Sequence, residues 1–123
     1  MTEAEVIELV GIHAANAITA FTVFVSFTFG FLAAAYFVGP NLTSAQAIIA
    51  TLLYSVSAGA AIATHALFHQ IIFATLGSAS SSIDSLFLLT NEAIWVWGMV
   101  SVQLTGMAAS IYFMWSVRHP KSE

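Results

Sequence analysis

The sequence predicts an all-α membrane protein in which three transmembrane helices form one bundle. Of its 123 residues, 59% are hydrophobic and only 7% are charged, whereas about 25% of the residues of a soluble domain are charged. The apolar residues are gathered into stretches long enough to cross the hydrocarbon core of a bilayer. Short polar breaks that carry helix-capping signals separate these stretches. We therefore treat residues 1–123 as a single transmembrane domain.

The first predicted span covers residues 14–38, which include no charged side chain. Such a segment is long enough for a bilayer core of about 30 Å. Gly39 and Pro40 follow, and a C-cap glycine with a proline behind it typically ends a helix. Thr43 and Gln46 have the spacing of a capping box, which predicts the start of a second helix. Because the connection is short, we expect the first two helices to form an antiparallel hairpin.

The second and third spans are predicted at residues 44–65 and 92–117. The apolar stretch that begins at Ser44 runs to Leu76, which corresponds to about 50 Å of helix and exceeds the bilayer core. We therefore expect the end of this helix to emerge from the membrane. A serine-rich linker follows, and Ser81 and Asp84 give a possible capping signal after it.

Basic residues set the expected orientation. Arg118 and Lys121, the only Arg and Lys in the chain, both lie in the polar tail at 118–123. The positive-inside rule then predicts a cytoplasmic C-terminus, and three spans place the acidic N-terminus outside. The excess helix falls on that non-cytoplasmic side. It comprises residues 3–13, 66–76 and 82–91.

The same composition excludes several function classes. Two basic residues give no electrostatic footprint for nucleic acid. The absence of cysteine excludes disulfides and thiolate metal sites. The expected partners are the lipid bilayer, further copies of this chain, and a larger membrane complex. The expected location is the cell membrane, specifically a bacterial inner membrane.

Small residues recur four apart along each span, a spacing that lets transmembrane helices approach closely. On a helical wheel the small and hydroxyl residues of each span share one face. In the first span this face lies opposite Phe21, Phe24 and Phe31, which we expect to face lipid. The residues expected at helix contacts are Ser26, Gly30 and Ala34 in the first span, Ser55 and Gly59 in the second, and Gly106 and Ser110 in the third.

Two further polar residues, Asn16 and Gln103, lie on these faces and are expected inside the membrane. Ordinary helix packing explains such faces without any further function. An alternative is a water-filled path along Thr51, Ser55 and Gln103. Because three helices are too few to enclose a wide channel, that alternative requires an oligomer.

Histidines provide the candidate site. His65 and His69 are four residues apart on one helical face, a spacing that lets two imidazoles bind one metal ion. The predicted topology places Glu92 and His13 at nearly the same depth. These four residues therefore form a candidate site at the outer membrane interface for a transition metal or haem, or for a quinone. Structural or solvated roles for the same side chains are the alternative.

No enzyme motif is recognisable. His65 and His69 have the spacing of the zinc-protease motif H-E-x-x-H, but Ala66 stands where that motif has its glutamate. The leading hypothesis is a non-enzymatic, oligomerising or accessory subunit of a membrane complex. A redox subunit that binds a metal, haem or quinone is the second hypothesis, and a small oligomeric channel is the third.

The segment 16–46 carries one resemblance. Ala35-Tyr36-Phe37-Val38-Gly39, followed by Leu42-Thr43-x-x-Gln46, resembles small uncharacterised three-span membrane proteins of bacteria. The matched residues are mainly a span end and a turn. The resemblance implies a bacterial, multi-helix membrane protein and implies no activity.

Overall fold

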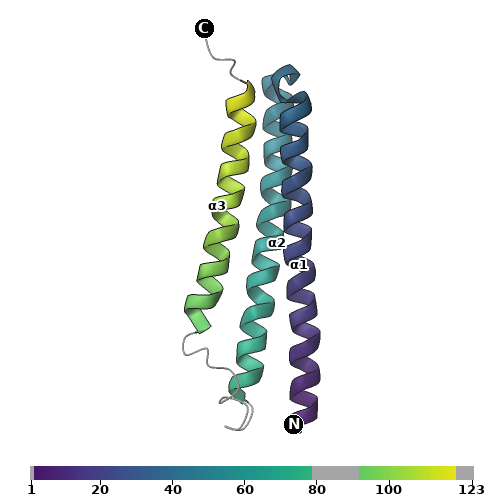
Figure 1. Cartoon of the computed structure of the whole chain (residues 1–123), viewed down its shortest axis with the longest axis vertical. Coiled ribbons are helices and arrows are strands. Elements are labelled where there is room, and N and C mark those ends of the chain that lie inside the picture. Colours follow the sequence, from purple (N-terminus) through teal and green to yellow (C-terminus); the bar gives the residue numbers. More distant parts are fainter. Residues whose placement is uncertain (1, 79–91, 119–123) are drawn as a thin grey trace.

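The computed structural model describes residues 2–78 and 92–118, and within these ranges every side chain except those of Ser78, Glu92 and Ala93. Its three long helices are α1 (Glu3–Val38), α2 (Ser44–Ser78) and α3 (Glu92–Arg118), with the short 3-10 helix η1 (Gly39–Asn41) between the first two (Figure 1). All described residues other than Thr2, Leu42 and Thr43 are helical. The predicted all-α fold with three long apolar helices is confirmed.

Each helix is long and apolar enough to cross a membrane. The qualifying segments are Glu3–Asn41, Ser44–Gly77 and Ile94–Arg118. The 36 residues of α1 and the 35 of α2 are continuous helices. At 1.5 Å per residue each is over 50 Å long, more than a bilayer core of about 30 Å.

Capping boxes begin the first two helices. The Thr2 hydroxyl accepts a hydrogen bond from the Glu5 amide at 3.3 Å, and the Glu5 carboxylate accepts one from the Thr2 amide at 2.6 Å. Thr43 and Gln46 make the same reciprocal pair at 3.2 and 2.9 Å. The capping box predicted at Thr43 is therefore confirmed. Both boxes satisfy backbone donors that a helix start leaves unpaired.

Gly39 has a different role from the one that the sequence suggests. Its φ and ψ of −48° and −46° are right-handed, so it is not the left-handed C-cap that favours glycine. The backbone continues into η1, where Pro40 occupies the first turn. A Cβ at position 39 would lie 2.8 Å from Cγ2 of Val117. Glycine is required here because α3 approaches the backbone closely.

The three helices lie side by side, with α2 antiparallel to both of the others (Figure 1). The Phe31 and Tyr54 rings stack at 4.2 Å between α1 and α2. Arg118 at the end of α3 donates hydrogen bonds to the Leu42 carbonyl oxygen and the Ser44 hydroxyl, at 3.3 and 3.1 Å. The α1–α2 connection and the basic end of α3 therefore meet at one end, opposite the acidic start of α1.

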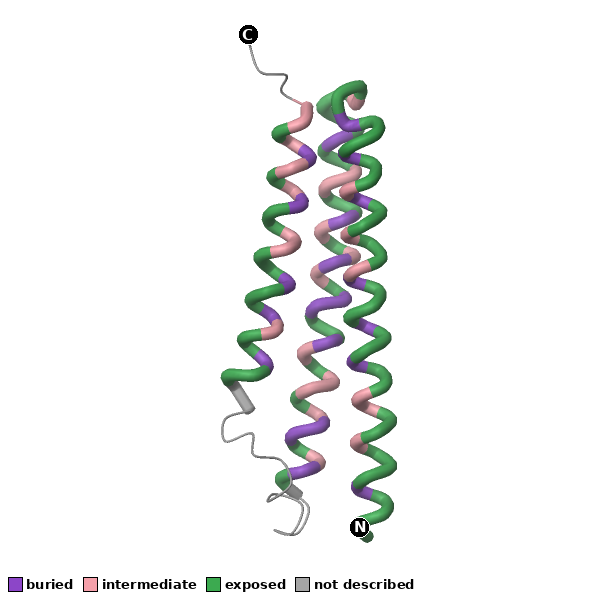
Figure 2. Tube along the Cα trace, viewed as in Figure 1, coloured by how far each residue is buried: buried purple, intermediate pink, exposed green. Residues whose placement is uncertain are grey.

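Buried residues follow one side of each helix (Figure 2). The main cluster includes Phe24, Phe31, Tyr54, Ile62, Val100 and Met114. The structure reverses most of the expected faces of the first span, because Phe24 and Phe31 are buried while Ser26 and Gly30 are exposed. Phe21 is exposed, as predicted. A helical wheel shows which residues share a face, but it does not show whether that face contacts lipid or another helix. Here the large aromatic rings fill the space between the helices.

The predicted outer extension is partly described. Val6 of α1 packs against Ile72 and Leu76 of α2 in a second, smaller cluster. Ile7 and Leu67 stay exposed. Residues 82–91, including the capping signal at Asp84, lie outside the described residues.

Candidate functional site

A chain of three polar side chains joins α2 to α3 in the interior. Nδ1 of His65 lies 2.9 Å from Oε1 of Gln103, and Nε2 of His65 lies 3.0 Å from Nε2 of His69. His65 is 5% exposed and Gln103 only 1%. The Phe21 ring of α1 approaches His65, with 5.6 Å between the ring centroids. All three helices thus contribute to this environment.

With the Gln103 amide oriented as in the structure, the hydrogen bonds determine the positions of the protons. Because the Gln103 oxygen can only accept, Nδ1 of His65 donates to it, and Nε2 of His65 keeps its lone pair. Nε2 of His69 must then donate to Nε2 of His65. This arrangement leaves Nδ1 of His69 unprotonated. The chain of hydrogen bonds is complete with both imidazoles neutral, which suits an apolar setting.

The chain ends at a buried donor. Nε2 of Gln103 is buried and has no hydrogen-bond partner among the described residues. Rotating this amide by half a turn exchanges its nitrogen and oxygen. The amide then donates to Nδ1 of His65, and both imidazole hydrogen bonds reverse direction. In that state Nδ1 of His69 carries a proton and is a donor.

The two imidazoles line a groove between α1 and α3. Its volume is about 870 Å³, within the range typical of small-molecule sites. Phe21 and Ile18 border it from α1, and Trp95 and Met99 from α3. Apart from the imidazoles, the lining consists of apolar side chains and Gly98. The groove is therefore nearly apolar, and its polar groups are chiefly the two imidazoles.

The structure does not bring His13 together with His65 and His69. His13 stacks on Phe68, with ring centroids 5.9 Å apart, and its Nδ1 is buried without a partner among the described residues. The described side chains include no group of three His, Cys, Asp or Glu placed to hold a metal ion. His13 is thus separate from the His65–His69 pair. Position 92 is helical, but the Glu92 side chain lies outside the described residues.

The His65–His69 geometry bears on the expected cofactors. The axial ligands of a haem lie on opposite sides of its iron, so at about 2 Å per bond their nitrogens are roughly 4 Å apart, with the porphyrin between them. The two Nε2 atoms are 3.0 Å apart on adjacent turns of one helix, an arrangement that does not fit one haem held by both histidines. A single metal ion bound by both nitrogens needs only a small opening of this pair. Gln103 would then orient His65 through Nδ1.

The predicted helix-contact residues divide into two groups. Gln103 and Ser110 are buried, and Ser55, Gly59 and Gly106 are half-buried. A Cβ at Gly106 would lie 3.8 Å from the Phe24 ring, an ordinary contact. The predicted faces of α2 and α3 therefore point inward. The α1 residues of the prediction, namely Asn16, Ser26, Gly30 and Ala34, are exposed instead.

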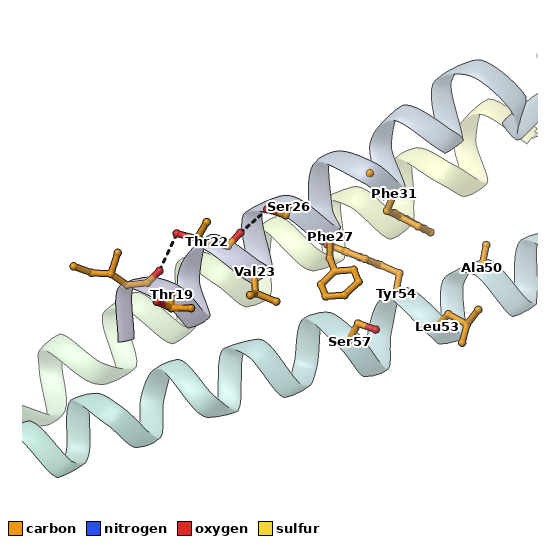
Figure 3. A pocket seen from close by; sticks show the side chains of 12 residues that line it. Thr19, Thr22, Val23, Ser26, Phe27, Phe31, Ala50, Leu53, Tyr54 and Ser57 are labelled. Carbon is orange, nitrogen blue, oxygen red and sulfur yellow. Dashed lines mark hydrogen bonds between the residues drawn. The ribbon is translucent and has the colours of Figure 1, made fainter. Parts of the chain in front are cut away.

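A second groove follows that exposed stripe of α1 (Figure 3). It lies between α1 and α2 and has a volume of about 720 Å³. Thr22, Ser26 and Gly30 border it on one side, and Ala50 and Ser57 on the other. The hydroxyls of Thr22 and Ser26 donate to carbonyl oxygens one turn earlier in α1, at 2.9 Å each. The small residues therefore leave open space beside a backbone whose hydroxyls are already satisfied.

Sequence reasoning missed the Thr28–Tyr54 pair. The two hydroxyls lie 2.9 Å apart and connect α1 to α2 near the stacked Phe31 ring. The pair could not be recognised in the sequence, because neither Thr28 nor Tyr54 belongs to a stripe of small residues. Tyrosine within a predicted span, away from the interfacial belt, is the signal that suggests such a bond.

Comparison with known proteins gives no further guidance, since no known family, curated protein or solved structure matches this chain. The resemblance to small three-span bacterial membrane proteins stays a prediction.

Proposed function

We propose that this chain is a three-span membrane protein that works as a non-enzymatic subunit by associating with further copies of itself. The supporting observation is the groove between α1 and α2, which the small residues Ser26 and Gly30 border. In lipid, helix association depends on close packing rather than on hydrophobic burial, so small residues collect where helices meet. On α1 these residues are not used within the chain.

The space beside Gly30 is open. Nothing lies within 4 Å of a Cβ built at Gly30. Ser26, Gly30 and Ala34 are spaced four apart on one exposed line of α1, a pattern that permits close helix crossing. A second copy of α1 crossing at this line fills the space that the small residues leave. A second copy is therefore the expected occupant.

The proposed orientation places the α1–α2 connection in the cytoplasm. Arg118 and the connection lie at the same end of the molecule, while Glu3, Glu5 and Glu8 lie at the opposite end of the helices (Figure 1). The positive-inside rule supports a cytoplasmic C-terminus. The extra length of α1 and α2 beside the acidic end then projects outside.

Substitution of Gly30 tests self-association. Gly30→Leu adds bulk to the groove, and no atom of the described residues lies within 4 Å of a Cβ at this position, so the folded protomer is expected to persist. We expect this variant to shift the oligomer toward the monomer by at least tenfold in dissociation constant, as measured by analytical ultracentrifugation in detergent. Gly98→Leu is the matched control, because a Cβ at Gly98 also meets nothing and α3 carries it on another face.

The result has a clear interpretation. Wild type and Gly98→Leu are expected to associate alike. Equal association of wild type and Gly30→Leu would contradict the proposed contact, and a wild type that is monomeric throughout would contradict the proposed function.

A further inference from the structure

The groove between α1 and α3 is the second unexplained feature of the molecule. Its volume is about 870 Å³, and its wall carries the imidazoles of His65 and His69. Both lie in α2, which is apolar enough to span a membrane, at the outer end of the predicted span 44–65. Ionisable side chains placed there are uncommon and often mark a functional site.

The lining restricts the ligand to a largely apolar molecule. Ile18, Ile94 and Val102 border the groove and are exposed by 67, 68 and 71%. In the membrane these side chains contact lipid, so a ligand reaches the groove from the bilayer. The described residues that line the groove include no Lys or Arg to neutralise a phosphate or carboxylate. A neutral, lipid-soluble molecule fits these properties.

The wall of the groove favours a flat ring. Phe21 of α1 and Trp95 of α3 both line it. Aromatic side chains pack well against planar rings, with about 4.5–7 Å between centroids. An acyl chain would gain nothing specific from this pair of aromatic residues.

The imidazole pair favours a ring that bears oxygen atoms. Nδ1 of His69 is not used in the chain of hydrogen bonds through His65 and Gln103. With the Gln103 oxygen facing His65, Nδ1 of His69 accepts from a hydroxyl. With the amide rotated, the same nitrogen donates to a carbonyl. The pair therefore adapts to either oxygen form while both imidazoles stay neutral.

We propose that the groove between α1 and α3 binds a membrane quinone and its quinol, with the His69 imidazole as hydrogen-bond partner of a ring oxygen. His65 and Gln103 are positioning residues that set the tautomer of His69. The inference goes beyond self-association, because it uses a different surface. The proposal concerns binding of the quinone and the quinol and includes no redox step.

Binding is tested with wild-type protein in nanodiscs and decylubiquinone as the probe. Because Trp95 lines the groove, we expect saturable quenching of tryptophan fluorescence, and its loss in Trp95→Phe. His69→Phe keeps the ring but removes both nitrogens, so we expect at least a tenfold increase in the dissociation constant for the quinone. Decylbenzene, which lacks oxygen atoms, should bind weakly and equally to both proteins.

Gly98→Leu provides an independent variant that fills the groove. No atom of the described residues lies within 4 Å of a Cβ at this position, and leucine is a good helix former. Gly98→Leu should abolish saturable quenching, whereas Gly30→Leu should bind quinone as wild type does. Each of these two variants is thus expected to impair one property, which separates failure of this proposal from failure of self-association.

Two results would overturn the inference. Quenching that rises linearly with quinone and is identical in all variants would show simple partitioning into the bilayer. Equal quinone affinities for wild type and His69→Phe would show that the histidine does not recognise the ring. If His69→Phe lost its helical circular dichroism, Gly98→Leu would decide alone.

Discussion

Nδ1 of His65 lies 2.9 Å from Oε1 of Gln103, and this hydrogen bond joins the middle of α2 to the middle of α3. Both residues are almost fully buried. The hydrogen bond orients the His65 imidazole and gives its N–H an acceptor within the apolar interior. It therefore couples the stability of the fold to the candidate site.

The first prediction concerns Gln103→Leu. The substitution keeps a side chain of similar length but leaves the His65 N–H without its acceptor. We expect a loss of about 1–3 kcal/mol in the free energy of unfolding, the cost of an unsatisfied buried donor. Titration with sodium dodecyl sulfate, followed by circular dichroism, measures it. Gln70→Leu removes an exposed amide from α2 and should change little.

The second prediction concerns Gly39→Ala. The added Cβ would lie 2.8 Å from the Val117 side chain, closer than carbon atoms approach. The start of the α1–α2 connection or the end of α3 must then shift, at a cost of about 1–3 kcal/mol. Gly59→Ala is the control, because its Cβ meets nothing within 4 Å. Equal stability of the two variants in the same detergent titration would show that α3 does not approach Gly39 as described.

The third prediction separates the two contacts of Tyr54. Tyr54→Phe removes the hydrogen bond with Thr28 and keeps the ring stacked on Phe31. Hydrogen bonds between transmembrane helices contribute about 0.6 kcal/mol on average and at most about 1.7. We expect a loss in this range, with a further loss of about 0.5–1.5 kcal/mol for Tyr54→Leu, which also removes the stacking. Tyr112→Phe, at an exposed position, should be neutral.

Much of the fold could be predicted from local signals. The apolar lengths predicted three long helices, and Thr43 with Gln46 predicted the start of α2. These features depend on residues close together in the sequence. The role of Gly39 could not be found in this way, because its cause is the Val117 side chain of α3.

The candidate site was predicted in part. The spacing of His65 and His69 correctly placed two imidazoles together, since four residues make one turn of helix. Gln103 was expected inside the membrane, but its pairing with His65 depends on how α3 packs beside α2. His13 was grouped with the pair by depth alone. Depth does not fix the direction of a side chain around the helix, and His13 faces Phe68 instead.

The inverted prediction for α1 has a similar cause. Periodicity showed that the small residues and the phenylalanines occupy different faces, but both faces are compatible with lipid. Phe24 and Phe31 fill the space between the helices, which leaves Ser26 and Gly30 outside. The small residues of α1 were expected at contacts within the chain. We propose instead that they form contacts between chains.

The fourth prediction concerns topology. A fluorescent protein that matures only in the cytoplasm should be bright when fused after Glu123. Alkaline phosphatase, which is active only outside the cytoplasm, should be active when fused before Thr2. The physical reason is that Arg118 and Lys121 favour retention of the C-terminal end. Both ends on the same side would contradict three spans.

The fifth prediction uses the lack of cysteine in the chain. Ser26→Cys introduces a single thiol on the exposed stripe of α1, and Ser101→Cys introduces one at an exposed position of α3. A disulfide requires Cα atoms within about 7 Å. Two copies that cross at Ser26 and Gly30 meet this condition at position 26 only.

Oxidative cross-linking of these two variants in native membranes is the most direct measurement of self-association through α1. We predict covalent dimers for Ser26→Cys and monomers for Ser101→Cys, as resolved by non-reducing electrophoresis. Gly30→Leu combined with Ser26→Cys should remove the dimers. Equal cross-linking of Ser26→Cys and Ser101→Cys, or none at position 26, would contradict the proposed contact.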